Sequence, residues 1–288
     1  MLKTKHIVIF SVFITIITGV RCFFVSAFVN PQTGFYGVEN IWTTIFNLSL
    51  LIIGSVGAVF VLFYSTNDDS SVEIKFSKKW GIIFAIVSVL FGVFFLYDFL
   101  KHKEQIVGFL PSGIANVSFQ LFPGSSMGTI RQYFGLVSGI VFIIQGVLFL
   151  MGQHAMLKTN LMKLVQVLPI LWAIAKVMQV LDAYVTIYYI SEHIIAIFAL
   201  VFIMRALYSQ ATLLAFNTNT RGFVKTHIVA SLLAIFFSCL VVVPFYIFPA
   251  FGNFHGSEFY YGTINAFILF AALYVCGFLI SFSLERGA

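Results

Sequence analysis

The sequence predicts an all-α membrane protein with eight transmembrane helices, and three observations support this class. The chain of 288 residues is 60% apolar, and its mean hydropathy is +1.03. Only 9% of its residues are charged, whereas soluble domains carry about 25%. Eight apolar stretches approach the roughly 20 residues that cross a bilayer. There is too little charge to cover a water-facing surface, which excludes a soluble enzyme, a nucleic-acid-binding protein and a disordered chain.

The predicted spans follow one another along the whole chain. Helices are the expected form, because runs of this length must satisfy their own backbone hydrogen bonds in lipid. Clusters of polar, Gly and Pro residues separate the first spans, at residues 30–34 and 67–71. The spans are predicted at residues 7–29, 41–64, 80–100, 129–152, 161–182, 192–213, 224–248 and 260–283.

The distribution of Lys and Arg predicts the orientation of the chain. If the N-terminus is cytoplasmic, most of the 16 basic residues fall on the cytoplasmic side, and Lys101, Lys103 and Arg131 lie outside. Cytoplasmic loops are enriched in Lys and Arg, so both termini are predicted to be inside. The same rule accounts for the net charge of +6 without a nucleic-acid partner.

Short similarities between the two halves predict an internal duplication. Residues 36–41 resemble residues 189–194, and each segment leads into the second span of its half. Residues 128–133 resemble residues 262–267, which open the last span of each half. Because the matches keep their order and each unit has an even number of spans, we predict two parallel four-span repeats.

The duplication divides the chain into two predicted units, residues 1–152 and residues 153–288. The first unit contains an outer segment, residues 101–125, that has no counterpart in the second. This segment is too short and too often broken by Pro and Gly to span a bilayer. A lid, a re-entrant loop and an interfacial segment are all compatible with its composition.

Charged side chains inside the predicted spans mark candidate binding positions, because each costs about 2.5–3.5 kcal/mol to insert. Arg21 lies in the first span, and Lys176 lies at the matching place in the fifth. Glu39 and Glu192 follow at the outer starts of the second and sixth spans. A base and an acid in each repeat suit a small polar or anionic solute, or an ion. The alternative is two buried ion pairs that hold neighbouring helices together.

The fifth span adds further polar positions. Trp172, Lys176 and Gln179 share one face of a helix, and Asp182 lies beside that face. A polar face on a membrane helix is expected to point into the bundle rather than into lipid. Pro169 is expected to kink the same helix, because its ring clashes with the preceding turn and it has no N–H to donate.

The fourth span has a face of small and polar residues. Arg131, Gly135, Ser138 and Gln145 share this face, which is more typical of a helix-packing seam than of a ligand groove. His193, beside Glu192, begins the sixth span at its outer side. The complete set of candidate ligand-binding residues is Arg21, Glu39, Arg131, Lys176, Gln179, Asp182, Glu192 and His193.

The sequence contains no recognised catalytic or metal-binding motif. It lacks H-E-x-x-H, G-x-S-x-G, a P-loop and a glycine-rich dinucleotide fingerprint. Cys22, Cys239 and Cys276 are dispersed, so they indicate neither a disulfide framework nor a metal site. His193 and His227 begin spans on opposite sides of the membrane, too far apart to share a metal. We therefore expect no catalytic residue, no metal and no cofactor.

The turn Asn30-Pro31-Gln32-Thr33-Gly34-Phe35-Tyr36 after the first span resembles a turn in multi-pass membrane proteins of anaerobic Gram-positive bacteria. The resemblance covers mainly residues 18–45. It implies a location in the cytoplasmic membrane of a bacterium, and it implies no particular activity.

Three functions are compatible with these patterns. The first is a transporter-like or permease-like protein that binds a small polar or anionic solute, or an ion, in an outward-facing cavity between the repeats. The second is a non-catalytic membrane subunit or sensor that binds a protein partner, and association with a second copy is also open. The third, an intramembrane enzyme, requires converging polar groups that the spacing does not show. The lipid bilayer is the one partner that all three require.

Overall fold

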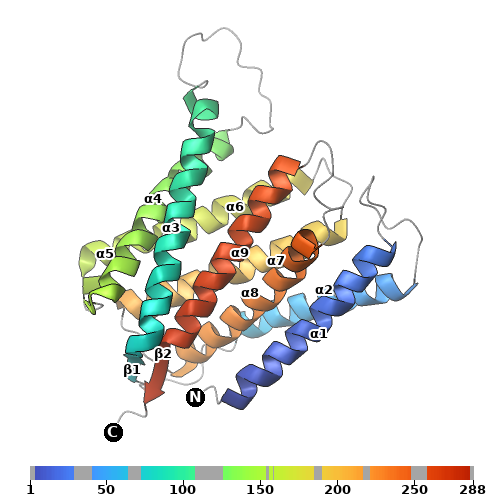
Figure 1. The fold of residues 1–288 in the computed structure, drawn as a ribbon, viewed down its shortest axis with the longest axis horizontal. Helices are drawn as coiled ribbons and strands as arrows, with labels where there is room; N and C mark the ends of the chain where they lie inside the picture. The colour runs from blue at the N-terminus through green and yellow to red at the C-terminus, as the bar shows by residue number, and fades with distance from the viewer. Residues whose placement is uncertain are drawn as a thin grey trace.

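The computed structural model describes residues 4–28, 41–63, 73–107, 126–153, 156–157, 159–184, 190–216, 221–247 and 258–285. Eight long helices make up most of this part of the chain (Figure 1). They are α1 (Thr4–Phe28), α2 (Ile41–Phe63), α3 (Lys78–Val107), α4 (Ser126–Leu150), α6 (Leu168–Tyr184), α7 (Ile190–Ala211), α8 (Arg221–Ile247) and α9 (Glu258–Ser281). The shorter elements are β1 (Glu73–Phe76), α5 (Asn160–Val165), the π-helical turn η3 (Thr212–Phe216) and β2 (Phe282–Glu285).

The long helices confirm the predicted multi-pass architecture. Each predicted span coincides with one of them, and the fifth span is shared between α5 and α6. In the described part of the chain, 7 helical segments are long and apolar enough to cross a membrane. An eighth apolar segment, Ala266–Ser281 in α9, is shorter than these. The protein is therefore a multi-pass helical membrane protein.

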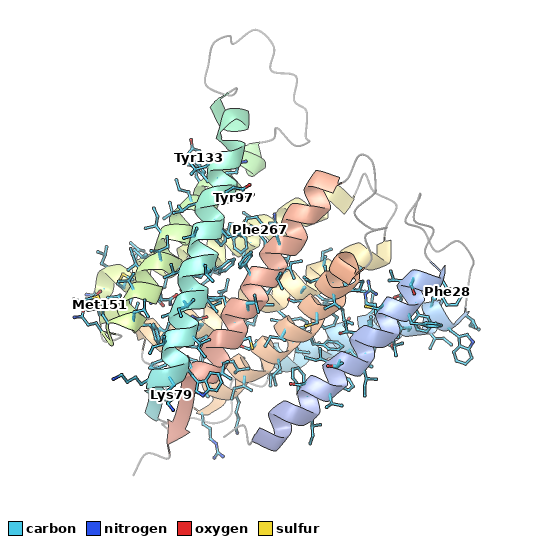
Figure 2. All side chains as sticks on the ribbon, viewed as in Figure 1. Phe28, Lys79, Tyr97, Tyr133, Met151 and Phe267 are labelled. Carbon is cyan, nitrogen blue, oxygen red and sulfur yellow. The ribbon has the colours of Figure 1, made fainter. Side chains whose placement is uncertain are left out.

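The outside of the bundle is apolar, as contact with lipid requires. Large apolar side chains are exposed along α1 and α2, from Ile9 to Phe23 and from Ile41 to Val59. Tyr97 and Tyr133 project outward near one end of α3 and α4 (Figure 2). Tyr side chains favour the boundary between lipid and water, where the ring contacts acyl chains and the hydroxyl remains hydrated.

Two short strands depart from the predicted all-helical fold. β1 pairs antiparallel with β2, from Glu73 opposite Glu285 to Phe76 opposite Phe282. The N–H of Ser77 extends this pairing by donating to the carbonyl of Ser281, at 2.8 Å. The packing of α3 against α9 explains the strands, because it places the segments at the ends of these helices side by side.

The second half of the chain provides the centre of the bundle. In the spans of α7 and α8, 56% of the residues are buried, whereas in the spans of α1 and α2 only 17% are. α7 and α8 pack against each other, and α9 packs against both α8 and α3. α4 packs against α3 and α6, while α1 and α2 lie against α8 and α7. Two pairs of helices from the first half thus cover different sides of a centre formed by the second half.

The ends of the described chain lie together. α1 begins, and β2 ends, at the same end of the bundle (Figure 1), as an even number of spans requires. The side of the membrane on which this end lies, the division into two units and the parallel repeat stay predictions. Residues 101–107, predicted as the start of the outer segment, continue α3, and residues 108–125 lie outside the described part of the chain.

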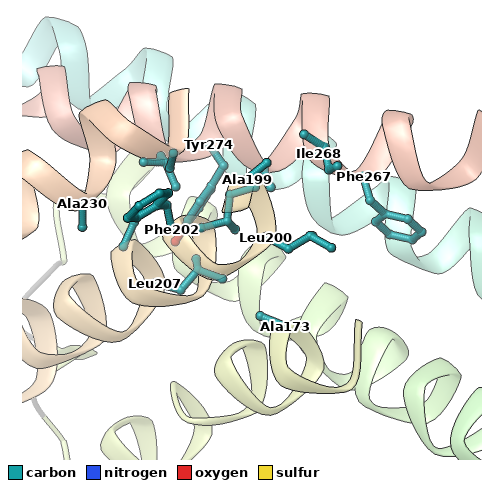
Figure 3. Packing of buried hydrophobic residues seen from close by; sticks show 14 of the residues in the cluster. Ala173, Ala199, Leu200, Phe202, Leu207, Ala230, Phe267, Ile268 and Tyr274 are labelled. Atoms are coloured by element: carbon teal, nitrogen blue, oxygen red, sulfur yellow. The ribbon is translucent and has the colours of Figure 1, made fainter. Parts of the chain in front are cut away.

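Aromatic rings fill the middle of the bundle. Phe91 and Phe142 lie 4.7 Å apart between ring centroids, and Phe142 lies at the same distance from Tyr274. Phe95 meets Trp172 edge to face, with centroids 4.6 Å apart. Figure 3 shows part of the buried cluster that contains Tyr274 of α9, Ala199 of α7 and Ala230 of α8. Small residues of this kind allow helices to approach closely.

Glycines bring α3 and α4 into close contact. A Cβ atom on Gly92 would lie 2.5 Å from the carbonyl oxygen of Gly139, and a Cβ on Gly139 would lie 2.8 Å from the Cβ of Phe95. Beside this contact, the Ser88 hydroxyl donates to the carbonyl of Phe142 at 2.7 Å. Gly135 and Ser138 of α4 are buried as well, so this part of the predicted small-residue face of the fourth span is a packing seam.

Adding a methyl group to this seam tests the contact. We expect Gly139→Ala to lower the apparent unfolding temperature in detergent, because overpacking costs about 1–3 kcal/mol. Gly19→Ala is the matched control, since nothing lies within 4 Å of a Cβ at Gly19. Both variants gain the same helix propensity, about 1 kcal/mol. Equal unfolding temperatures for the two variants would contradict close packing of α3 on α4.

Candidate functional site

The two deepest charged candidates, Arg21 and Lys176, are both buried, with 1% and 0% of their surface exposed. They contact different parts of the bundle. The Arg21 Nε atom donates to the carbonyl oxygen of Leu240 on α8, at 2.7 Å. The Lys176 Nζ atom lies 4.7 Å from the ring centroid of Phe267 on α9, within the range of a cation–π interaction. Each thus joins its own helix to a neighbouring helix.

A proline explains the position of Arg21. In an α-helix, the N–H of a residue donates to the carbonyl four residues earlier. Pro244 lies inside α8 and has no N–H, so it leaves the carbonyl of Leu240 without its helical donor. Arg21 supplies the replacement from α1. The contact joins α1 to α8 through a backbone carbonyl.

Lys176 lies on the inward face of α6. Trp172 is also buried on this face, so the part of the predicted polar face that includes Trp172 and Lys176 points into the bundle. Gln179 and Asp182 continue along α6, but their side chains lie outside the described part of the structure.

The remaining candidates are placed only by their backbone. Arg131 belongs to α4, while Glu192 and His193 belong to α7, and their side chains are not among those described. Glu39 lies outside the described residues altogether. A common site for the predicted charged set therefore stays a prediction.

The described residues also line a small, partly open cavity of about 20 Å³ within the bundle. Its walls come from α4, from the junction of α5 and α6, from the end of α7 and from α9. A water molecule needs a space of at least about 10–15 Å³, so the cavity is large enough for one. The lining residues are Val141, Phe142, Gln145, Gln166, Pro169, Leu207, Gln210, Ala211 and Tyr274.

Two helix irregularities meet at this cavity. The first is the break between α5 and α6, at the place where Pro169 was predicted to disturb the fifth span. Pro169 has no N–H, so the carbonyl of Val165 lacks its helical donor. Just before Pro169, the N–H of Val167 donates to the carbonyl of Leu164, at 3.1 Å, in a tight turn. The second is the change from α7 to the π-helical turn η3 after Ala211. α5 contacts η3, so the two irregularities lie next to each other.

A chain of hydrogen bonds crosses the cavity wall. The Gln210 Nε2 atom donates to the Tyr274 hydroxyl oxygen at 2.5 Å, and this hydroxyl donates to Gln145 Oε1 at 2.5 Å. A phenol has one hydrogen, so its donation to Gln145 requires it to accept from Gln210. The three side chains, from α4, α7 and α9, therefore hold a fixed order of donors and acceptors.

Other polar atoms of the cavity have no partner from the protein. Gln166 is 4% exposed, and neither its Nε2 nor its Oε1 atom has a hydrogen-bond partner among the described residues. The same holds for Gln210 Oε1. A buried polar group without a partner costs about 1–3 kcal/mol. Gln166 and Gln210 both line the cavity, so an occupant that reaches these atoms would supply the missing partners.

A second polar cluster adjoins the first through α7. His227 of α8 is fully buried, and its Nδ1 atom lies 2.7 Å from the hydroxyl oxygen of Ser209. Ser209 precedes Gln210 in the chain and also donates to the carbonyl of Ala206, at 2.9 Å. The contact between His227 and Ser209 joins α7 to α8. Within the described residues, no group of three or more His, Cys, Asp and Glu side chains could hold a metal ion.

The sequence pointed to only part of this site. Gln145 was singled out for its place on the inward face of α4, and Pro169 for its effect on the helix. Gln166, Gln210 and Tyr274 were not predicted, because neutral side chains cost less to bury than charged ones and therefore stand out less in an apolar span. An available signal was the occurrence of neutral amides in otherwise apolar spans, since a buried amide also requires partners.

The fold and the apolar exterior together define a multi-pass helical membrane protein with a small cavity within its bundle. Comparison with known proteins adds no closer assignment: no protein-family model, no curated protein and no solved structure matches the chain.

A double-mutant cycle tests the role of Arg21. We expect Arg21→Met to lower the free energy of unfolding by about 1.5–3 kcal/mol, the range for hydrogen bonds to charged groups. In a Pro244→Ala background, the new N–H of residue 244 donates to Leu240, so the same substitution should cost less. The coupling should exceed about 0.5 kcal/mol. An equal loss in both backgrounds would show that Arg21 does not replace the missing amide.

Removal of one hydroxyl tests the hydrogen-bond chain. Tyr274→Phe leaves Gln145 Oε1 and Gln210 Nε2 without the partner they share, so we expect a loss of stability of about 1–3 kcal/mol. Tyr208→Phe is the matched control, because Tyr208 is 44% exposed. Denaturant unfolding in detergent micelles measures both. Equal free energies of unfolding for Tyr274→Phe and Tyr208→Phe would show that the hydrogen-bond chain does not stabilise the protein.

Proposed function

We propose that the protein is transporter-like and that a small polar solute binds in the cavity between α4, α6, α7 and α9. One observation carries the proposal: buried amides without protein partners line a cavity at two helix irregularities. Irregular backbone at membrane depth is tolerated where it lines a cavity, and transporters build solute sites from such helices. A non-catalytic subunit requires no internal cavity, so the cavity favours the transporter.

The position of the cavity supports access from one end of the bundle. Gln145 lies near the end of α4, and Gln210 is followed by Ala211, the last residue of α7. α4 and α9 run toward the end of the bundle that contains β1 and β2 (Figure 1). By the distribution of basic residues this end is cytoplasmic, in the membrane of a bacterium. An outward-facing cavity between the repeats, lined by the charged set, stays a separate prediction.

Aromatic side chains close the other end of the cavity. Pro169, Trp172 and Lys176 follow one face of α6, so a path from Lys176 to the cavity passes Trp172. Trp172 is packed against Phe95 and lies 5.4 Å from Phe267 between ring centroids. We propose that these three rings form a barrier, and that passage of the solute requires them to separate.

Cysteine accessibility tests the proposed function without knowledge of the solute. In a background without Cys22, Cys239 and Cys276, we expect Ala211→Cys in the cavity wall to react with a membrane-impermeant thiol reagent. Reaction should be faster from the side of the membrane that carries the chain ends. Ala173→Cys is the matched control, since Ala173 is 0% exposed beside the aromatic barrier. Labelling in vesicles of both orientations gives the rates.

The two cysteine variants separate the possible outcomes. Rapid labelling at position 211 together with slow labelling at position 173 supports a cavity that is open to water at one end. If neither position reacts from either side, the cavity is sealed and the transporter proposal fails.

A further inference from the structure

The partnerless atoms of the cavity define the hydrogen bonds that its occupant must make. Gln166 Oε1 and Gln210 Oε1 each require a donor. Gln166 Nε2 requires an acceptor. The donation from Gln210 Nε2 to Tyr274 fixes the orientation of the Gln210 amide, so its oxygen remains available to accept. A matching molecule therefore carries at least two N–H or O–H donors and one lone pair.

The cavity wall also selects for the charge of its occupant. Among the described residues that line it, none is Asp, Glu, Lys, Arg or His. An ion in such a place has no opposite charge, and burial of an unpaired ion costs far more than burial of a neutral hydrogen-bonding group. An anion would also face the two amide oxygens of Gln166 and Gln210. Arg21 and Lys176 are not among the lining residues, so they do not neutralise an anion there.

The size of the cavity adds a third constraint. A volume of about 20 Å³ accommodates one water-sized molecule. A larger planar molecule requires the walls to separate slightly. The turn before Pro169 and the π-helical turn η3 are the places where the walls depart from regular α-helix. Such irregular turns adjust more readily than continuous helices and are frequent at functional sites.

We infer that the cavity takes small, neutral solutes with both donors and acceptors, of the urea type. This inference rests on the proposed function and names the class of solute for the same site. Urea offers four N–H donors and one carbonyl acceptor, which meet the two amide oxygens and the amide nitrogen. Water shares this chemistry, and the experiment separates the two.

Solute flux in proteoliposomes tests the inference. Stopped-flow light scattering measures the entry of urea, of water and of guanidinium, which is a charged molecule of the same shape as urea. We expect urea to enter faster than in protein-free vesicles, and guanidinium to enter no faster. Gln166→Met should slow urea entry roughly tenfold, the effect of losing about 1.4 kcal/mol of hydrogen bonding. Gln153→Leu is the matched control, because Gln153 is exposed.

A second measurement does not depend on the folding of the Gln166 variant. Urea in the cavity should slow the labelling of Ala211→Cys in the cysteine-free background, and guanidinium chloride at the same concentration should not. If position 211 is labelled but urea neither crosses nor protects, the assigned class of solute is wrong and the transporter proposal stands. Flux of water alone, or equal flux of guanidinium, also overturns the assignment. If position 211 is not labelled at all, the proposed function itself fails.

Discussion

The structure depends on one constraint: inside an apolar bundle, each polar group must find its partner within the protein or in a bound molecule. The clearest case is the carbonyl of Leu240, which loses its helical donor at Pro244 and accepts from Arg21 instead. A similar contact joins α3 and α4, where the Ser88 hydroxyl donates to the carbonyl of Phe142. Since the helices are apolar on most sides, such contacts specify which helices are neighbours.

The cavity is the place where the protein alone does not meet this constraint. Pro169 interrupts the fifth span, and η3 loosens the end of α7, so two regular hydrogen-bond patterns end beside each other. The amides of Gln166 and Gln210 lie at these ends and retain unused donors and acceptors. An arrangement of this kind lowers stability when the cavity is empty, and it offers binding energy to a solute that supplies the missing hydrogen bonds.

The charged residues show why a high cost of burial does not by itself indicate a binding site. Burial of the charged side chains of Arg21 and Lys176 costs free energy, and both were predicted to bind a ligand for this reason. In the structure, a backbone carbonyl and an aromatic ring are among their contacts, and both contacts join helices. Burial of the neutral Gln166 and Gln210 side chains costs less free energy, so the sequence does not mark them as clearly. Their unused hydrogen-bonding atoms nevertheless make them better candidates to hold a solute.

The sequence alone determined the class of protein, the positions of its long helices, the interruption near Pro169 and the inward faces of α4 and α6. These properties depend on hydropathy and periodicity along one segment, which are local. Only the tertiary structure decided that α7 and α8 form the centre, that β1 pairs with β2, and that Tyr274 joins Gln210 to Gln145, at separations of 64 and 129 residues. The physical reason is that helices apolar on nearly every side have many equivalent ways to pack. Small residues and buried polar groups select among these ways, and their partners are distant in the sequence.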